Sequence, residues 1–160
     1  MRLLILAVGN ARGTSEGALT DDFVTRAKNM GRNMGVPDVA VEEVAVSKAR
    51  DTPKRMQDEA ERLSARVPDG AQVILLDARG KGMTSEDFAE MIGALRDAGT
   101  KNLVFVIGGP DGLGTLPKIR PGRSLAFGTQ TWPHLMVRAM LSEQLYRALT
   151  ILAGHPYHRA

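Results

Sequence analysis

The sequence predicts an α/β domain with a mostly parallel sheet, because two kinds of segment alternate along it. Short apolar runs bounded by glycine and proline alternate with longer segments whose apolar residues recur every three or four positions. The 160 residues, 43% of them hydrophobic, are enough for one core, and no apolar run reaches the roughly 18 residues of a membrane span. We therefore expect one domain over residues 1–160.

Five segments have the length and apolar character of strands. The opening run is typical of a buried strand, and Val73–Asp77 is a short apolar run that ends in a carboxylate. Leu103–Ile107 leads directly into a glycine-rich loop, and ligands bind at such strand ends in open α/β sheets. The expected strands cover residues 3–8, 39–46, 73–77, 103–107 and 125–127.

Four segments have helical spacing and helix-end signals. Thr52 is expected to cap the second helix, with Pro53 at its first position, and the third begins at Ser85 and ends at Gly99. The last helix, at about residues 133–153, is apolar over a wider arc than one sheet face needs, so part of it is expected to pack against a second subunit. The first expected helix covers about residues 19–34 and the second about 53–63.

Charge and cysteine content limit the partners. A net charge of +3 with a pI near 9.5 is mildly basic, so any contact with RNA must be local. Without cysteine the chain has no disulfides or thiolate metal sites, and its start lacks the pattern of a signal peptide, so we expect a cytoplasmic protein without membrane contact. The cationic residues form two groups, each interpretable as RNA-contacting or as ordinary solvated surface: Lys48, Arg50, Lys54 and Arg55, and Lys118, Arg120 and Arg123.

Two loops are candidate ligand sites. Gly108 and Gly109 follow a strand, so a ligand could approach the backbone, although a plain turn is the alternative. The loop is not a Walker motif, and Pro110 interrupts the dinucleotide-binding spacing, so phosphate binding is disfavoured. The second loop, Gly128–Pro133, precedes the last helix, where Thr131 could be the N-cap and Trp132 could instead belong to the core.

The C-terminal tail concentrates unusual side chains: His155, Tyr157, His158 and Arg159. Pro156 prevents the two histidines from lying one turn apart on a continuing helix, and no acidic residue is near, so a metal site is disfavoured. A base-binding or proton-handling segment is the functional interpretation. A disordered tail is the alternative.

Three segments in this order resemble one family: Ile107–Gly112 (IGGPDG), Trp132–Ala148 (WPHLMVRAMLSEQLYRA) and His155–Arg159 (HPYHR). Together they are similar to the ribosomal RNA large subunit methyltransferase H family. These are small SPOUT-class enzymes that methylate N3 of a pseudouridine in bacterial 23S rRNA. The similarity covers essentially the whole chain, and Gly80 and Lys81 match a Gly-Lys pair of the family.

The resemblance implies a homodimer with a C-terminal deep trefoil knot, whereas general rules against knots predict a flavodoxin-like sheet. It implies S-adenosyl-L-methionine as cofactor and ribosomal RNA in the assembled ribosome as partner, with no metal. The tail, His155, Tyr157, His158 and Arg159, would face the target base as the catalytic residues. The cofactor residues carried over are Leu76, Gly108, Gly109, Gly128, Thr129, Gln130, Thr131, Trp132 and Pro133.

For the chemistry, we expect Arg159 to orient the base and stabilise charge, because arginine is a poor base, and His158 or water to accept the N3 proton. Two alternatives stay open: a non-enzymatic nucleotide-binding or ribosome-associated module, and a flavodoxin-like phosphate binder. Both predict that S-adenosylhomocysteine leaves the Trp132 fluorescence unchanged, whereas the methyltransferase interpretation predicts a change.

Overall fold

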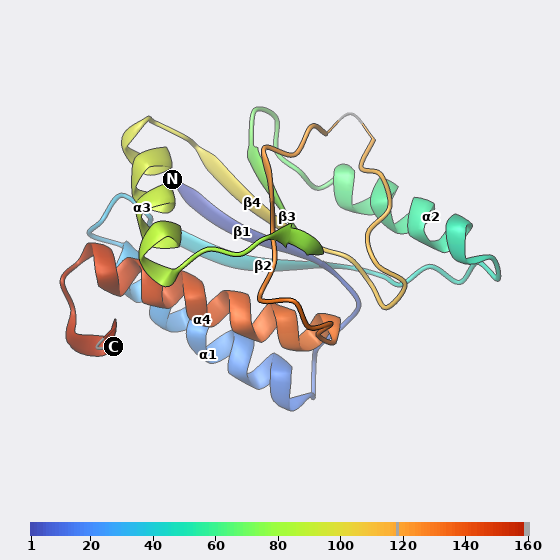
Figure 1. Cartoon of the computed structure of the whole chain (residues 1–160), viewed down its shortest axis with the longest axis horizontal. Coiled ribbons are helices and arrows are strands. Elements are labelled where there is room, and N and C mark those ends of the chain that lie inside the picture. Colours follow the sequence, from blue (N-terminus) through green and yellow to red (C-terminus); the bar gives the residue numbers. More distant parts are fainter. Residues whose placement is uncertain (118, 159–160) are drawn as a thin grey trace.

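The computed structural model describes residues 1–117 and 119–158, so Lys118, Arg159 and Ala160 lie outside it. Over the described residues the core is a five-stranded sheet in which all paired strands are parallel, in the order β2-β1-β4-β3-β5 (Figure 1). The α/β class and the parallel sheet are therefore confirmed. The strands are β1 (Arg2–Val8), β2 (Asp38–Val44), β3 (Gln72–Lys81), β4 (Asn102–Ile107) and β5 (Arg123–Leu125).

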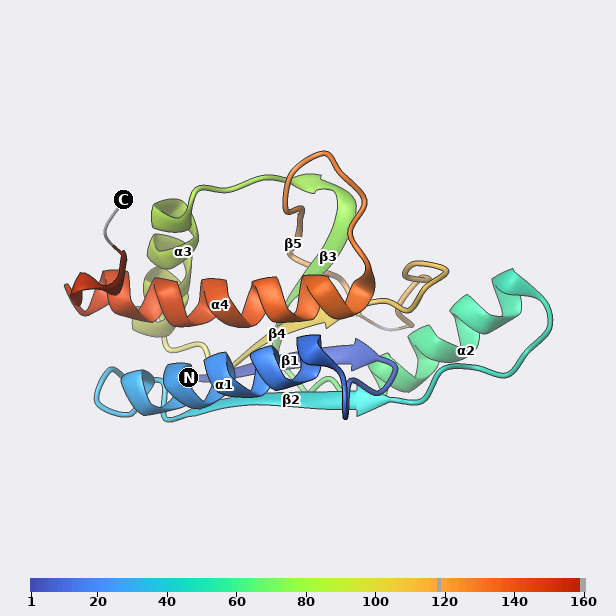
Figure 2. The same cartoon turned by 90° about the horizontal axis from the view of Figure 1, so that it is seen from below.

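The helices cover both faces of the sheet. Leu3, Ile5 and Ala7 of β1 face a core shared with α1, α3 and α4, whereas Leu4 and Leu6 face a smaller core shared with α2. This alternation follows from the two-residue period of a strand. Figure 2 shows α1 and α4 running side by side, with α2 apart from them. The helices are α1 (Ser15–Gly31), α2 (Thr52–Ser64), α3 (Ser85–Asp97), α4 (His134–Leu152) and the short 3₁₀ helix η1 (Pro156–His158).

The strand order differs from the flavodoxin-like sheet that general rules predict. A flavodoxin-like sheet has the order 2-1-3-4-5, whereas here the third and fourth strands are exchanged. β4 consequently lies between β1 and β3 and is buried along Leu103–Ile107. The flavodoxin-like expectation is wrong, because β4 rather than β3 pairs with β1. This pairing places the glycine loop after β4 near the middle of the sheet.

Two predicted helix caps are wrong. Asp51, not Thr52, is the N-cap of α2, and its carboxylate accepts a hydrogen bond from the Lys54 amide at 3.0 Å. Thr131 does not cap α4: Pro133 occupies the N-cap position, and no side chain bonds to the free amides. These amides at the start of α4 therefore face the loop before it.

Two strands, β3 and β5, also have bounds that differ from the predicted ones. The segment around Gly80 and Lys81 lies beyond the expected strand at residues 73–77 but continues β3, because Lys81 pairs with Leu125 of β5 after an irregularity in register. A side chain on Gly80 would collide with the Leu125 backbone, at 2.7 Å from its carbonyl carbon, so this close pairing requires glycine. β5 accordingly covers Arg123–Leu125 rather than residues 125–127.

Candidate functional site

A pocket of about 330 Å³ lies between the second half of β3, the loops after β4 and β5 and the start of α4. The structure therefore brings together loops that are far apart in the sequence. Thr129 and Pro133 are not among the residues that line the pocket. The other predicted cofactor residues line it: Leu76, Gly108, Gly109, Gly128, Gln130, Thr131 and Trp132.

The loop after β4 needs glycine at both of its first positions. A Cβ on Gly108 would lie 2.5 Å from the Gly112 carbonyl oxygen, a backbone atom that cannot move aside easily. A Cβ on Gly109 would lie 2.9 Å from Oε2 of the buried Glu59 and 3.0 Å from Cγ1 of Val8. The loop closes with a 3.0 Å hydrogen bond from the Gly112 amide to the Gly109 carbonyl. The pocket wall here is thus bare backbone, which a ligand can approach closely.

Arg55 of α2 holds the same loop from outside, a role that the sequence interpretation missed. Its Nε donates to Oδ2 of Asp111 at 2.8 Å, and its Nη2 donates to Oγ1 of Thr52 at 2.7 Å. Its Nη1 donates to the Ala49 and Arg50 carbonyls at 3.1 and 2.9 Å. The hydrogen bond from Arg55 keeps the pKa of the Asp111 carboxyl below its ordinary value. One guanidinium therefore links the glycine loop to α2 and to the segment before it.

Trp132 closes the opposite side of the pocket. It is 42% exposed, so the alternative of a core tryptophan is wrong. Its Nε1 donates to the Phe127 carbonyl at 2.8 Å, and this bond spans the loop that carries Gly128, Gln130 and Thr131. The indole thus holds the second loop in shape and lines the pocket, where a ligand would change its surroundings.

The start of α4 supplies two further groups. His134 lines the pocket, and its pKa lies below the ordinary 6.5, mainly because burial disfavours the charged form and also because Arg138 is near. Arg138 is 1% exposed; it bonds to Glu43 and donates to the carbonyls of Val8 and Gly9 at 3.2 and 3.0 Å. This arginine, isolated in the apolar arc of α4, was a signal that the sequence interpretation did not use. It fixes α4 to the end of β1.

The predicted catalytic residues lie elsewhere in the chain. Tyr157 packs against Tyr146 with ring centres 4.5 Å apart, and its hydroxyl donates to Glu143 at 3.2 Å. Burial, and then the Glu143 carboxylate, raises the Tyr157 pKa above its ordinary value. Nδ1 of His158 is buried and has no hydrogen-bond partner within the described residues, and Arg159 lies outside them. The tail is thus packed on α4 as far as His158, so the alternative of a disordered tail is wrong up to that residue.

Within one chain the tail does not meet the pocket. The pocket includes His134 at the first turn of α4, whereas the tail follows its last turn, and a helix of 19 residues is roughly 28 Å long. Figures 1 and 2 both show the last turns of α4 remote from the loop that leads into its first turn. The two halves of the predicted site therefore lie at opposite ends of one helix.

Comparison with known proteins identifies the family. The family model described as "Predicted SPOUT methyltransferase" matches residues 1–158. Ribosomal RNA large subunit methyltransferase H of Rhodopseudomonas palustris (strain ATCC BAA-98 / CGA009) is 50% identical over 162 residues, covering 100% of both chains. Proteins of the same name from Bradyrhizobium diazoefficiens and Hyphomonas neptunium are 45% and 47% identical over 160 residues, again covering 100% of both chains. The chain belongs to the ribosomal RNA large subunit methyltransferase H family of SPOUT methyltransferases.

SPOUT methyltransferases use S-adenosyl-L-methionine, and the chemistry of the residues that line the pocket is compatible with this molecule. Leu76, Ile107 and Val137 would provide apolar walls for an adenine ring, and the bare backbone at Gly108 and Gly109 would provide polar groups. The lowered pKa of His134 favours the neutral imidazole, which avoids repulsion of a sulfonium cation. These groups would hold the cofactor without a metal.

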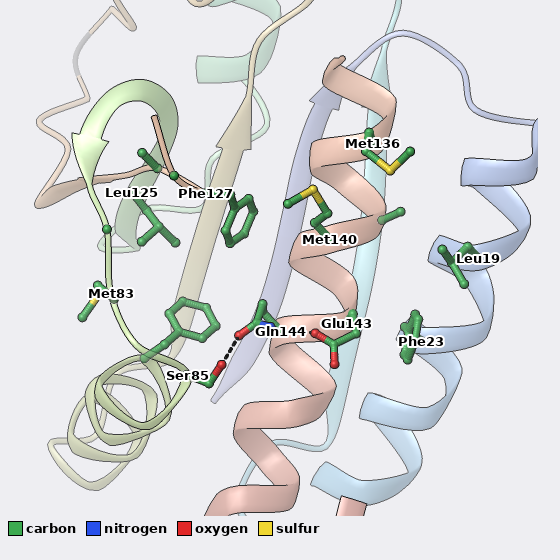
Figure 3. Close-up of a pocket in the computed structure, with 15 residues that line it drawn as sticks. Leu19, Phe23, Met83, Ser85, Leu125, Phe127, Met136, Met140, Glu143 and Gln144 are labelled. Carbon is green, nitrogen blue, oxygen red and sulfur yellow. Dashed lines mark hydrogen bonds between the residues drawn. The ribbon is translucent and has the colours of Figure 1, made fainter. Parts of the chain in front are cut away.

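An apolar hollow of about 550 Å³ is lined by α1, α4 and the segment after β3 (Figure 3). Leu19 is 46% exposed and Met136 is 36% exposed at its rim. A hydrogen bond of 2.8 Å from Ser85 to Gln144 joins α3 to α4 below it. This excess of apolar surface agrees with the wide apolar arc noted for the last helix. Its apolar lining includes Leu19, Phe23, Met83, Leu125, Phe127, Met136 and Met140.

The described residues hold neither a helix suited to a membrane nor a group suited to a metal ion. None of their helices is both long and apolar enough to cross a lipid bilayer. Among residues 1–117 and 119–158, no three histidine, aspartate or glutamate side chains are grouped as metal ligands would be.

Proposed function

We propose that the protein transfers a methyl group from S-adenosyl-L-methionine to N3 of a pseudouridine in 23S rRNA of the assembled ribosome, in the cytoplasm. The observation that carries this proposal is the convergence of the two predicted glycine loops on one pocket in a chain that belongs to this methyltransferase family. The relatives named above match this chain over their full length, and their names describe them as ribosomal RNA methyltransferases. This similarity supports an rRNA substrate.

In this proposal the pocket binds and orients the methyl donor. Leu76, Gly108 and Gly109 form one wall. Gly128, Gln130 and Thr131 form the other, with Trp132 as its closing side chain. The cofactor supplies an electrophilic methyl group on a sulfonium. The protein contributes alignment and exclusion of water, and alignment alone can lower a barrier by roughly 7–11 kcal/mol.

The acceptor side of the site is proposed to come from a second protomer. Because the tail and the pocket of one chain lie at opposite ends of α4, a tail can act at a pocket only if another copy brings it there. The exposed apolar side chains around Leu19 and Met136 support a homodimer through this face. A C-terminal trefoil knot, implied by the family, is part of the same proposal.

The tail residues are proposed to handle the proton and the charge of the base. N3 of pseudouridine must lose a proton, and negative charge develops on the flanking carbonyl oxygens. His158 or water accepts the proton, and Arg159 stabilises the charge and orients the ring. His155 and Tyr157 complete the set, with Tyr157 fixing the tail on α4 through Tyr146.

The test is methyl transfer to ribosomes purified from cells that lack the gene, followed by mass mapping of the rRNA. The proposal expects one added methyl group on one pseudouridine at N3, and quenched or enhanced Trp132 fluorescence on addition of S-adenosylhomocysteine. A Trp132→Phe variant is the control for the fluorescence signal. An unchanged Trp132 fluorescence together with no methyl transfer would favour a non-enzymatic module instead.

A further inference from the structure

Three basic side chains from two segments of the sequence lie at or beside the cofactor pocket. Arg79 and Lys81 lie near the end of β3, and Arg123 begins β5, some forty positions later. β3 and β5 pair in parallel, with Ile74 opposite Arg123 and Lys81 opposite Leu125. The pairing therefore brings the cationic residues to one edge of the sheet.

These three side chains line one cavity of about 630 Å³, which we call the edge hollow. Asp87 is the single acidic residue in its described lining. The hollow adjoins the cofactor pocket, because Arg79 and Leu125 line both. A strand of RNA whose base entered the pocket could therefore pass its backbone through the hollow.

The cationic groups of the hollow retain free hydrogen-bond donors. The Arg79 side chain is 88% exposed and uses Nε and Nη2 to bond to Asp77, which leaves Nη1 without a partner in the described part of the chain. Lys81 and Arg123 are exposed and form no ion pair with any described residue. In a chain with a net charge of only +3, this is a local concentration of positive charge.

We propose that the edge hollow binds backbone phosphates of the rRNA strand beside the target nucleotide, through Arg79, Lys81 and Arg123. Phosphate contacts position a nucleic acid without reading its sequence, and cationic side chains in a concave site are suited to this. The inference rests on the proposed function, since it assigns a surface to the same RNA substrate. This inference also explains how a mildly basic chain can position an RNA strand, because the cationic side chains lie together next to the cofactor pocket.

The experiment measures ribosome binding by Lys81→Gln, Arg123→Gln and the double variant as a function of salt concentration. Each lost phosphate contact should reduce the salt slope of the logarithm of the binding constant by about 0.7, and the double variant should bind about tenfold more weakly. Lys101→Gln is the matched control, because Lys101 is an exposed cation at the opposite, amino end of β4. Affinity for S-adenosylhomocysteine reports that each variant is folded.

The outcomes separate this inference from the proposed function. If the wild type methylates ribosomes and the double variant keeps the wild-type salt slope, the edge hollow does not bind phosphate and only this inference fails. If the wild type transfers no methyl group, the proposed function fails first. A photoreactive side chain at position 123 should crosslink to rRNA, and crosslinks to ribosomal protein alone would overturn the assignment to RNA.

Discussion

The cofactor pocket and the C-terminal tail are built in contrasting ways. The pocket is assembled from the ends of three strands and the start of α4, and its wall is largely backbone, as at Gly108 and Gly109. The tail is a local structure, in which Tyr157 packs on Tyr146 and bonds to Glu143 within the same few turns. The pocket can hold a small molecule by itself, whereas the tail presents side chains that need a substrate brought to them.

In the proposed function, this contrast means that one chain carries two separate half-sites. α4 connects them and also holds them apart, because Arg138 fixes its first turns to β1 while Tyr146 and Glu143 fix the tail to its last turns. Donor binding should then depend only on the pocket, and methyl transfer on both regions.

The largest expected effect comes from removing residues 155–160. Turnover on ribosomes should fall by about a hundredfold or more, since a general base and a charge-stabilising group are both lost. Affinity for S-adenosylhomocysteine, measured by calorimetry, should stay at the wild-type value. A chain that lacks only Ala160 is the control. Loss of cofactor affinity in the tail-less dimer would contradict the separation of pocket and tail, because the tail would then take part in cofactor binding.

A smaller effect is expected for Gly108→Ala. The added Cβ would lie 2.5 Å from the Gly112 carbonyl oxygen, so the loop must shift. Affinity for S-adenosylhomocysteine should fall by at least about tenfold, with a loss in the free energy of unfolding of about 1–3 kcal/mol. Gly82→Ala is the matched control, since its Cβ would meet nothing within 4 Å. Equal affinities for the two variants would show that the loop is not the cofactor wall.

Much of the pocket could be predicted from the sequence, because it depends on local signals. Glycines after an apolar run predicted the loop at Gly108, and the family motif predicted the loop before His134. The position of β5 and the continuation of β3 through Gly80 could not be predicted, because both depend on pairing between segments about forty residues apart. The contact of Arg55 with the glycine loop could not be predicted for the same reason, because its partner Asp111 is 56 positions away.

Asp111→Asn should have a moderate effect on the pocket and none on the tail. The variant weakens the ion pair with Arg55, which is partly exposed, so affinity for S-adenosylhomocysteine should fall only about two- to fivefold. Asp22→Asn, which alters the exposed Arg26–Asp22 pair on α1, should leave it unchanged. An unchanged affinity in Asp111→Asn would mean that the glycine loop holds its shape without Arg55.

The smallest effect concerns pH. The His134 pKa is lowered by burial, so the imidazole is neutral above its ordinary 6.5 and becomes cationic only as the pH falls through the lowered value. Because the unfolded chain takes up this proton first, the unfolding free energy contributed by neutral His134 is lost as the pH falls below 6.5. Affinity for the sulfonium donor should decline only at still lower pH, as the imidazole of the folded protein becomes cationic. His134→Gln should remove that decline, and a decline that persists in the variant would assign it to another group.

The most direct test of two half-sites on two protomers is a mixed dimer. One chain lacks residues 155–160, and the other carries Gly108→Val, whose loop has no room for the larger side chain. The account predicts that each parent dimer is inactive and that the purified mixed dimer recovers about half of the wild-type turnover, because it holds one intact pocket facing one intact tail. A mixed dimer as inactive as its parents would contradict it, since the tail would then serve the pocket of its own chain.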